Sequence, residues 1–287
     1  MIERATREQV PELRALWQGA FGDGEAYLDQ FFARVFVPDN TLVWLENGHV
    51  VSVLYILPYI IPNGEENLRA AYLYALATEP AWRGRKIMSR LIEASFDLCA
   101  ARGYALSILV PAKDSLFGFY RSFGFEEYFD RVRIEKTRGE MSALGAGCEP
   151  AKLVQASTDM IWRQYRHGPF CGDGCVSLSM EQNAFYIDIL RAEGGDAFVF
   201  TAGGAPCYVL LSHRGKELVI YETNAEAREL GPLCAALCER FSFERATFFQ
   251  PQCFGKLETR RGRRPFAMAK FLRDVTIEKP FIGRVLL

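Results

Sequence analysis

A cluster of three cations marks a turn that could bind a polyanion. Arg83, Arg85 and Lys86 lie between a strand-like run that ends at Thr78 and a helical pattern that begins near Arg85. A turn from a strand into a helix exposes unpaired N–H groups at the helix N-terminus, and these groups bind anions. Cations at this end oppose the helix dipole, so a local anion would reconcile them. A basic surface turn without a ligand is the alternative explanation.

The segment around this turn resembles the acyl-CoA-binding motif of the GNAT superfamily of N-acetyltransferases. That motif is Gln/Arg-x-x-Gly-x-Gly/Ala after a strand that ends in a V-A-T-like triplet; Arg83 takes its first position. Lys86 stands where the first glycine is usual, and Met88 where the Gly/Ala is usual. Lys86 could compensate by neutralising a phosphate. The resemblance implies that acetyl-CoA, as co-substrate, is held by Leu76, Ala77, Thr78, Arg83, Gly84, Arg85, Lys86, Ile87, Met88 and Ser89.

A second segment, SLFGFYRSFGF at 115–125, is similar to the GNAT element F-Y-x-x-x-G-F. The two segments occur in the family's order, and we expect a catalytic GNAT domain over residues 1–137. By residue type alone, Tyr120 would be a packed aromatic. The resemblance implies instead that Tyr120 is the general acid that protonates the departing sulfur. A phenol with a pKa of about 10 stays protonated at neutral pH.

The resemblance implies direct transfer of acetyl to a primary amine in a ternary complex, without a metal. The family separates its fourth and fifth strands so that pantetheine lies between them, near Leu76 and Thr78, and a strand N–H such as that of Ala77 polarises the thioester carbonyl. The general base stays unassigned, because residues 70–74 contain no acid. Tyr72 and Tyr74 share one strand face and are candidates for lining the acceptor channel or holding a water, and Glu25 is another candidate for the base.

Aromatic and acidic residues near the N-terminus are candidate walls of an acceptor site. Packing in a core and solvation of the acids explain the same residues equally well. The class of acceptor that they favour is a cationic small-molecule or peptide amine. The aromatic candidates are Tyr27, Phe31, Phe32, Phe36 and Trp44, and the acidic candidates are Asp23, Glu25 and Asp29.

The elements around these motifs predict a mixed α/β fold of the order αββ-βαβαβ. A helical pattern that breaks at 22–24 is followed by two strands joined by the turn Asn47-Gly48. Pro58 and Pro62 are expected to interrupt the second of these strands. The remaining elements are a strand at 70–78, a helix at 85–101, a strand at 105–111, a short helix ending at Gly124 and a strand at 131–136.

The second half repeats this pattern without close identity. Thr223 lies 145 residues after Thr78, and Pro251 lies 140 after Pro111, both at matching strand ends. We expect a linker at 138–150 and a degenerate GNAT-like domain at 151–287, because no R-x-x-G-x-G follows Thr223. The layout, two GNAT-like units in tandem, resembles tandem-GNAT and Eis-type acetyltransferases. The sequence ends before the C-terminal sterol-carrier-like domain of Eis-type chains, so that domain is not expected.

Composition narrows the classes of partner. The 287 residues carry 34 Lys+Arg and 35 Asp+Glu and are 49% hydrophobic, which excludes intrinsic disorder and gives no general attraction to nucleic acid or membrane. The basic run at 260–264 is explained by a solvated loop. Without a signal sequence or an apolar stretch of spanning length, the chain is expected to be cytoplasmic. Cys171/Cys175 and Cys234/Cys238 lack the usual metal-site spacing, so they are interpreted as structural thiols.

Two other functions fit the same residues. Lys86 and Met88 could mark a degraded site in a non-catalytic acyl-CoA-binding or regulatory module. The fold could also use another acyl or aminoacyl donor. The second half could wall off the acceptor cleft or form a dimerisation surface, which leaves a homo-oligomer open.

Overall fold

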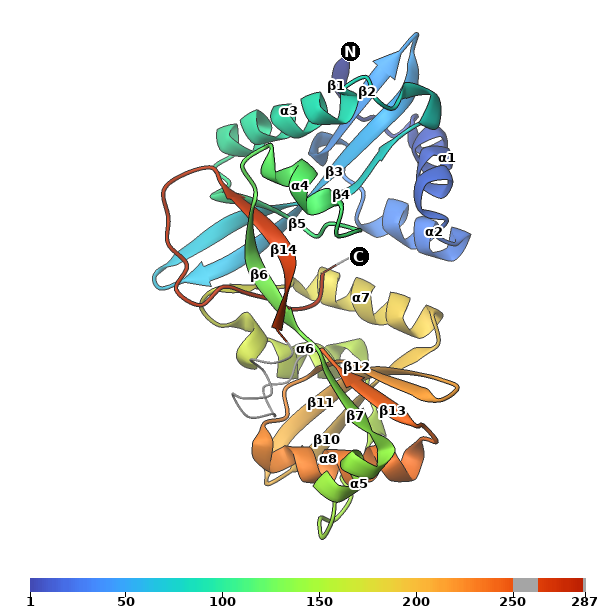
Figure 1. Ribbon diagram of the computed structural model, residues 1–287, viewed down its shortest axis with the longest axis vertical. Coiled ribbons are helices and arrows are strands. Elements are labelled where there is room, and N and C mark those ends of the chain that lie inside the picture. Colours follow the sequence, from blue (N-terminus) through green and yellow to red (C-terminus); the bar gives the residue numbers. More distant parts are fainter. Residues whose placement is uncertain (250–262, 286–287) are drawn as a thin grey trace. The chain divides into compact units, whose positions relative to one another are not determined.

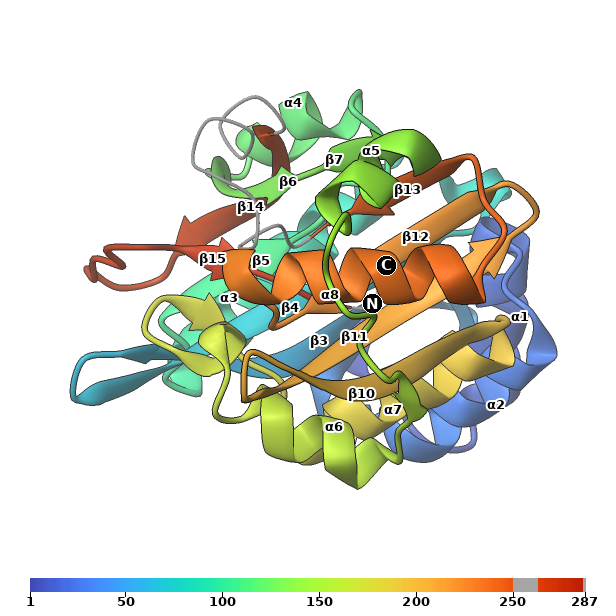
Figure 2. The same ribbon diagram turned by 90° about the horizontal axis from the view of Figure 1, so that it is seen from below.

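The computed structural model describes residues 1–249 and 263–285 and divides the chain into two compact units. The first unit comprises Met1–Tyr128 and Ala267–Glu278, and the second comprises Phe129–Phe266 and Lys279–Val285. Each unit has its own sheet with helices packed on it (Figures 1 and 2). The expectation of a mixed α/β fold with two units is therefore confirmed.

The first sheet has the strand order β1-β2-β3-β4-β5-β14-β6. Strands β1 to β4 pair antiparallel, β4 and β5 pair parallel, and β14 pairs antiparallel with β5. The strands are β1 (Ile2–Arg4), β2 (Thr41–Glu46), β3 (His49–Asn63), β4 (Glu66–Thr78), β5 (Leu106–Leu109), β14 (Arg263–Phe271) and β6 (Glu126–Val132). The helices of this unit are α1 (Val10–Phe21), α2 (Glu25–Arg34), α3 (Ile87–Ala101) and α4 (Leu116–Arg121).

The two faces of β4 have different cores. Leu73 packs with Leu91 of α3 and Tyr120 of α4 in one cluster of buried side chains. On the other face, Tyr74 contacts Trp17 of α1, with ring centroids 5.6 Å apart. Since alternate residues of a strand point to opposite faces, β4 lies between the α3/α4 layer and the α1/α2 layer.

Strand β3 corrects one sequence-based expectation. It continues through Pro58 and Pro62 to Asn63 and is not interrupted by either proline. The pairing of β2 with β3 ends at Tyr55, which lies opposite Thr41, whereas β4 pairs with β3 as far as Asn63. Proline lacks an N–H donor and is tolerated where one edge of a strand is not paired.

The second sheet has the strand order β7-β13-β12-β11-β10-β8. Strands β10, β11 and β12 pair antiparallel and β12 pairs parallel with β13, so they repeat the arrangement of β2, β3, β4 and β5. The strands are β7 (Ile134–Thr137), β13 (Arg245–Phe248), β12 (Glu217–Thr223), β11 (Ala205–Arg214), β10 (Gly195–Ala202) and β8 (Val154–Gln155). Helices α6 (Thr158–Tyr165), α7 (Met180–Ala192) and α8 (Ala227–Arg240) complete the repeated pattern.

The expected linker at 138–150 begins instead with a helix. Thr137 and Glu140 form a capping box at the N-terminus of α5 (Arg138–Leu144), and Met141 is fully buried in the core of the second unit. The unit boundary lies at Tyr128/Phe129, not at 137/138. The Gly/Ala-rich composition of this stretch predicts a linker. The sequence does not show that Met141 packs into the core of the second unit, which is what holds the helix in place.

The two halves exchange strands, which the order of motifs does not reveal. Strand β7, from the first half, pairs with β13 in the second sheet. Strand β14, from the second half, pairs with β5 in the first sheet. Neither unit is therefore a continuous piece of chain. Pro251 and residues 260–262 of the basic run lie outside the described residues.

The described residues also bear on metal and membrane binding. In residues 1–249 and 263–285, no group of three or more His, Cys, Asp and Glu side chains could hold a metal ion. The helices of these residues are all too short or too polar to span a membrane. Cys234 is fully buried in α8, while Cys175 of β9 (Cys175–Val176) is buried and forms no disulfide.

Candidate active site

A bulge in β4 interrupts its pairing with β3 in the middle of the first sheet. Val53 of β3 lies opposite Ala77 and Tyr55 lies opposite Tyr74, so two residues of β4, Ala75 and Leu76, face a single residue of β3. Ala75 has the left-handed φ of 45°, which is uncommon for a residue with a side chain. Bulges of this kind bend a strand and end its regular pairing.

The same part of β4 separates from β5. The two strands pair only from Ala70 to Tyr72, opposite Leu106 to Ile108, although β4 continues to Thr78. Within the described residues, the backbone from Leu76 to Thr78 therefore has no strand partner on the β5 side. Such an edge can accept an extended ligand that pairs with it as an added strand.

The turn after β4 combines cations with an uncapped helix N-terminus. A short 3-10 helix (Pro80–Trp82) is followed by Gly84, with φ 78°, and by Lys86, with φ 58°, which is the N-cap of α3. No side chain caps this helix and its first turn contains no acid. Its first backbone N–H groups, those of Ile87, Met88 and Ser89, are therefore available to an anion.

The three predicted cations lie at this turn and are exposed. The Nε of Arg83 donates to the carbonyl oxygen of Thr78 at 3.0 Å, which ties the turn to the end of β4. The guanidinium of Arg85 lies over the Trp82 ring, 4.5 Å from its centroid. The structure thus brings the predicted cofactor-binding residues together, from Leu76 to Ser89, along one strand edge and the following turn.

Tyr120 packs against the face of the first sheet that also contacts α3. It is 8% exposed in α4 and belongs to the buried cluster that contains Leu73. Burial raises its pKa to about 12, so the hydroxyl keeps its proton at neutral pH. Its hydroxyl is also close enough to Tyr72 to contribute to the raised pKa of that residue, after the larger effect of burial.

The aromatic candidates form one cluster on the other face, with one exception. Trp17 lies at its centre, with ring centroids 4.6 Å from Phe31 and 5.3 Å from Tyr55. The exception is Trp44, which packs on the α3 side beneath Arg90. Sequence periodicity did not single out Trp17 or Tyr55 as members of this wall. The remaining members are Tyr27, Phe32, Phe36 and Tyr74.

Tyr72 and Tyr74 are poor candidates for a base. Burial raises the pKa of both hydroxyls well above the ordinary value, so each holds its proton firmly. The hydroxyl of Tyr74 is hydrogen-bonded to that of Tyr27 at 2.7 Å. A buried phenol in such a pair can position a group by hydrogen bonding, but it does not accept a proton readily.

The acids predicted as cation partners are already engaged. Glu25 accepts hydrogen bonds from Arg14 and Gln18, and Asp29 lies 2.8 Å from the guanidinium of Arg14. Asp23 accepts a hydrogen bond from the indole of Trp17 at 2.8 Å. These carboxylates therefore link α2 and the turn before it to α1.

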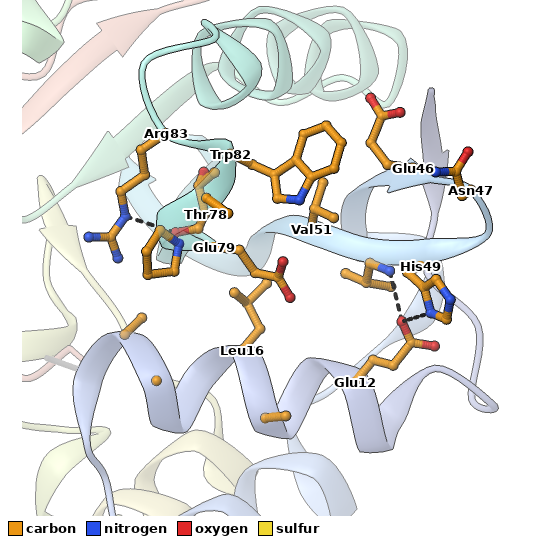
Figure 3. Close-up of a pocket in the computed structure, with 16 residues that line it drawn as sticks. Glu12, Leu16, Glu46, Asn47, His49, Val51, Thr78, Glu79, Trp82 and Arg83 are labelled. Atoms are coloured by element: carbon orange, nitrogen blue, oxygen red, sulfur yellow. Dashed lines mark hydrogen bonds and ion pairs between the residues drawn. The ribbon is translucent and has the colours of Figure 1, made fainter.

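A groove of about 730 Å³ lies instead between α1, the β2–β3 turn and the end of β4 (Figure 3). Its walls include Glu12, Glu46 and Glu79, none of which the sequence pattern indicated as a site. Each comes from a different element, and only the folded chain brings them to one cavity.

Comparison with known families agrees with the geometry. A family described as an acetyltransferase (GNAT) domain matches residues 1–128, which include the β4–α3 turn and Tyr120. Residues 1–128 form a GNAT domain. Comparison with curated protein sequences gave no significant match.

Solved structures share the fold of the GNAT domain and of the unit that follows it. A conserved protein of unknown function from Enterococcus faecalis V583, described as a probable N-acyltransferase, has 16% identity and a TM-score of 0.78 over 95% of this chain and 72% of its own. Eis1 from Mycobacterium abscessus has 14% identity and a TM-score of 0.71, and the match covers 95% of this chain and 74% of the Eis1 chain. A tandem GNAT protein from the clavulanic acid biosynthesis pathway has 14% identity and a TM-score of 0.54, and the match covers 96% of this chain and 100% of that protein.

Lys86 is the feature of the GNAT domain that departs most from the motif, and it is strained. The left-handed region, which glycine adopts freely, costs a residue with a side chain about 1 kcal/mol of conformational free energy. Lys86→Gly is therefore expected to raise the free energy of unfolding by about 1 kcal/mol. It should also weaken the binding of a phosphate-bearing ligand at this turn, because a cation is lost.

The matched control is Lys86→Ala, which removes the cation and keeps the strain. Thermal unfolding and calorimetric titration with coenzyme A separate the two effects. A Lys86→Gly protein less stable than wild type would contradict the assignment of strain.

Proposed function

We propose that the GNAT domain transfers an acetyl group from acetyl-CoA directly to a primary amine. Membership of the GNAT family indicates acyl transfer from an acyl-CoA in general. The observation that carries the specific proposal is the open edge of β4, from Leu76 to Thr78, which leads into the uncapped N-terminus of α3. An extended arm with a polyanionic end fits an edge and a cradle in this order.

In the proposed complex, the N–H groups at the start of α3 and the side chains of Arg83, Arg85 and Lys86 bind the phosphates. The backbone of Leu76 and Thr78 pairs with the pantetheine arm, and an N–H on this same edge polarises the thioester carbonyl. The N–H of Ala77, which the resemblance implied for this role, points instead to β3, because Ala77 lies opposite Val53 in the antiparallel ladder. Ser52 supports this edge, because its hydroxyl donates to the carbonyl oxygen of Ala77 at 2.8 Å. It was not singled out from the sequence, since a serine inside a strand carries no motif.

The proposed reaction forms one bond and breaks one. The neutral amine attacks the carbonyl carbon, the C–N bond forms and the C–S bond breaks. Tyr120 donates its proton to the departing thiolate, and the proton lost from the amine leaves to water. The phenolate then regains a proton from solvent. Alignment of the amine and the thioester supplies the remainder of the rate enhancement.

A second candidate function rests on the same turn. Lys86 and Met88 occupy positions where glycine or alanine would let a phosphate approach the backbone closely. A domain altered in this way could bind an acyl-CoA without turning it over and act as a regulatory module.

The experiment that tests the proposal is an assay of released thiol with acetyl-CoA and a panel of amines. The panel contains spermidine, kanamycin, lysine and a peptide with a free N-terminus. Thiol release that depends on an amine supports acetyl transfer. Binding of acetyl-CoA without release on any of these amines would favour the regulatory module, and release only with propionyl- or longer acyl-CoA would identify another donor.

Arg83→Ala is expected to weaken acetyl-CoA binding about tenfold or more. A hydrogen bond to a charged group contributes roughly 1.5–3 kcal/mol, and 1.4 kcal/mol corresponds to a factor of ten. Calorimetry provides the dissociation constant. The control is Arg34→Ala, at the end of α2, which should leave the affinity unchanged. Wild-type affinity in Arg83→Ala would remove Arg83 from the phosphate site.

A further inference from the structure

The groove beside α1 has the size and lining of a ligand site and is not used by the proposed reaction. Its volume of about 730 Å³ falls within the usual range of small-molecule pockets, roughly 300–1,000 Å³. One wall is the face of α1 that includes Glu12 and Leu16. The second is the β2–β3 turn, with Glu46 and Val51, and the third runs from Thr78 to Arg83 (Figure 3).

The charges of this groove select cations. Its lining carries the carboxylates of Glu12, Glu46 and Glu79 against one guanidinium, that of Arg83. The imidazole of His49 also lines the groove, with its Nδ1 3.8 Å from the carboxylate of Glu12 (Figure 3). Arg83 is itself engaged with the carbonyl oxygen of Thr78. A phosphate or carboxylate placed among Glu12, Glu46 and Glu79 would meet three like charges, which disfavours an anion in this part of the groove.

The three carboxylates are not equally occupied. Glu12 accepts a hydrogen bond from the N–H of Val50 at 2.8 Å, and Glu46 accepts one from the indole of Trp44 at 2.8 Å. The carboxylate of Glu79 forms no such bond within the described residues, and it points into the groove between α1 and the β4–α3 turn (Figure 3). Glu79 is therefore the primary cation partner.

The remaining walls are apolar. Leu16 and Val51 form the base of the groove, and the indole of Trp82 lies beside Val51 (Figure 3). Trp82 already holds a guanidinium, that of Arg85, over its ring. Methylene groups of a ligand would bury apolar surface here, and an aromatic ring adds attraction for a cation.

We propose that this groove binds an extended aliphatic cation in which ammonium groups alternate with methylene chains. The carboxylates bind the ammonium groups and the apolar base binds the methylenes. This ligand goes beyond the proposed function, because its binding does not depend on acetyl transfer. Thr78 and Arg83 line the groove and also belong to the proposed coenzyme A site, so the two ligands share a wall. A cation beside a bound polyanion is attracted to it, and each ligand therefore strengthens the binding of the other.

The test is a calorimetric titration of spermidine into the full chain at low salt. Spermidine is expected to bind, whereas triethylene glycol, an uncharged molecule of similar length, is not. Glu79→Gln should weaken spermidine binding about tenfold. The control Glu93→Gln removes a carboxylate from an exposed position of α3 and should leave the affinity unchanged.

A second titration uses protein saturated with coenzyme A, which carries no acetyl group to transfer. The dissociation constant of spermidine should then fall about threefold or more. The proposal is overturned if wild-type protein does not bind spermidine, if Glu79→Gln binds it as tightly as wild type, or if Glu93→Gln causes an equal loss. Because neither titration measures turnover, these results are independent of whether the domain transfers acetyl groups.

Discussion

Replacing Tyr120 by Phe is expected to lower kcat for acetyl transfer about 100-fold or more while leaving the affinity for acetyl-CoA unchanged. A general acid contributes typically 10²–10⁴-fold to a rate. Without the hydroxyl, the thiolate must leave unprotonated or take its proton from water. The ring of Phe retains the contacts with Phe119 and Phe125, whose centroids lie 5.3 and 6.1 Å from that of Tyr120, so the fold is preserved.

The pH dependence adds a second readout. Because burial raises the pKa of Tyr120 to about 12, the proton donor stays intact throughout the neutral and mildly alkaline range. Activity of wild-type protein should not fall on the alkaline side before the pH approaches this value, unless another group titrates. Tyr104→Phe is the matched control, since Tyr104 is 3% exposed and belongs to the same buried cluster. An unchanged kcat in Tyr120→Phe would remove Tyr120 from the mechanism.

Replacing Arg284 by Met is expected to destabilise the second unit by roughly 3–5 kcal/mol, because it leaves a buried carboxylate without its cation. Arg284 is 5% exposed, and its Nε lies 3.0 Å from Oε1 of the fully buried Glu222. Burial disfavours the charged form of Arg284, but Glu222 and the tyrosine hydroxyls around it together outweigh this effect, so the pKa of Arg284 lies above its ordinary value. Arg284 is therefore charged beside the carboxyl group of Glu222.

Two further side chains complete this buried network. Tyr208 donates a hydrogen bond to Glu222, and Arg284 donates one to the amide oxygen of Asn183 at 3.0 Å. Within the described residues, Oε2 of Glu222 and Nη1 of Arg284 have no hydrogen-bond partner. Loss of one charge thus leaves a carboxylate that is only partly satisfied, which is the costly case for a buried ion pair.

The matched variant is Glu222→Gln combined with Arg284→Met, which removes both charges. It should recover most of the stability, because replacing both partners of a buried pair is often nearly neutral. Urea unfolding followed by tryptophan fluorescence, to which Trp162 in α6 of the second unit contributes, gives the free energy of unfolding of both variants. Equal losses in the single and double variants would show that packing, and not charge, explains the effect.

The sequence predicted the parts of this molecule that depend on local order. The turn Asn47-Gly48, the run from Leu76 to Ser89 and the position of Tyr120 each follow from motifs a few residues long. Strand β14 could not be predicted to lie in the first sheet, because its partner β5 is distant in sequence and no pattern marks the exchange. Likewise, the continuation of β3 through Pro58 depends on where its pairing with β2 ends.

The candidate site shows the same limit. The cations at 83–86 were found because they are adjacent in sequence. Glu12 and Glu79 lie on α1 and after β4, and each alone is an ordinary surface acid. The acids chosen from the sequence, such as Glu25, are bound by Arg14, a partner that periodicity does not indicate.

The central claim is that the first unit binds acetyl-CoA along β4 and at the N-terminus of α3, and that the second unit does not. Calorimetric titration of acetyl-CoA into the wild-type chain tests it most directly. The expected result is one site per chain with a dissociation constant of tens of micromolar or tighter, that is, about −6 kcal/mol or more favourable. Absence of binding in this range, or two sites per chain, would contradict it.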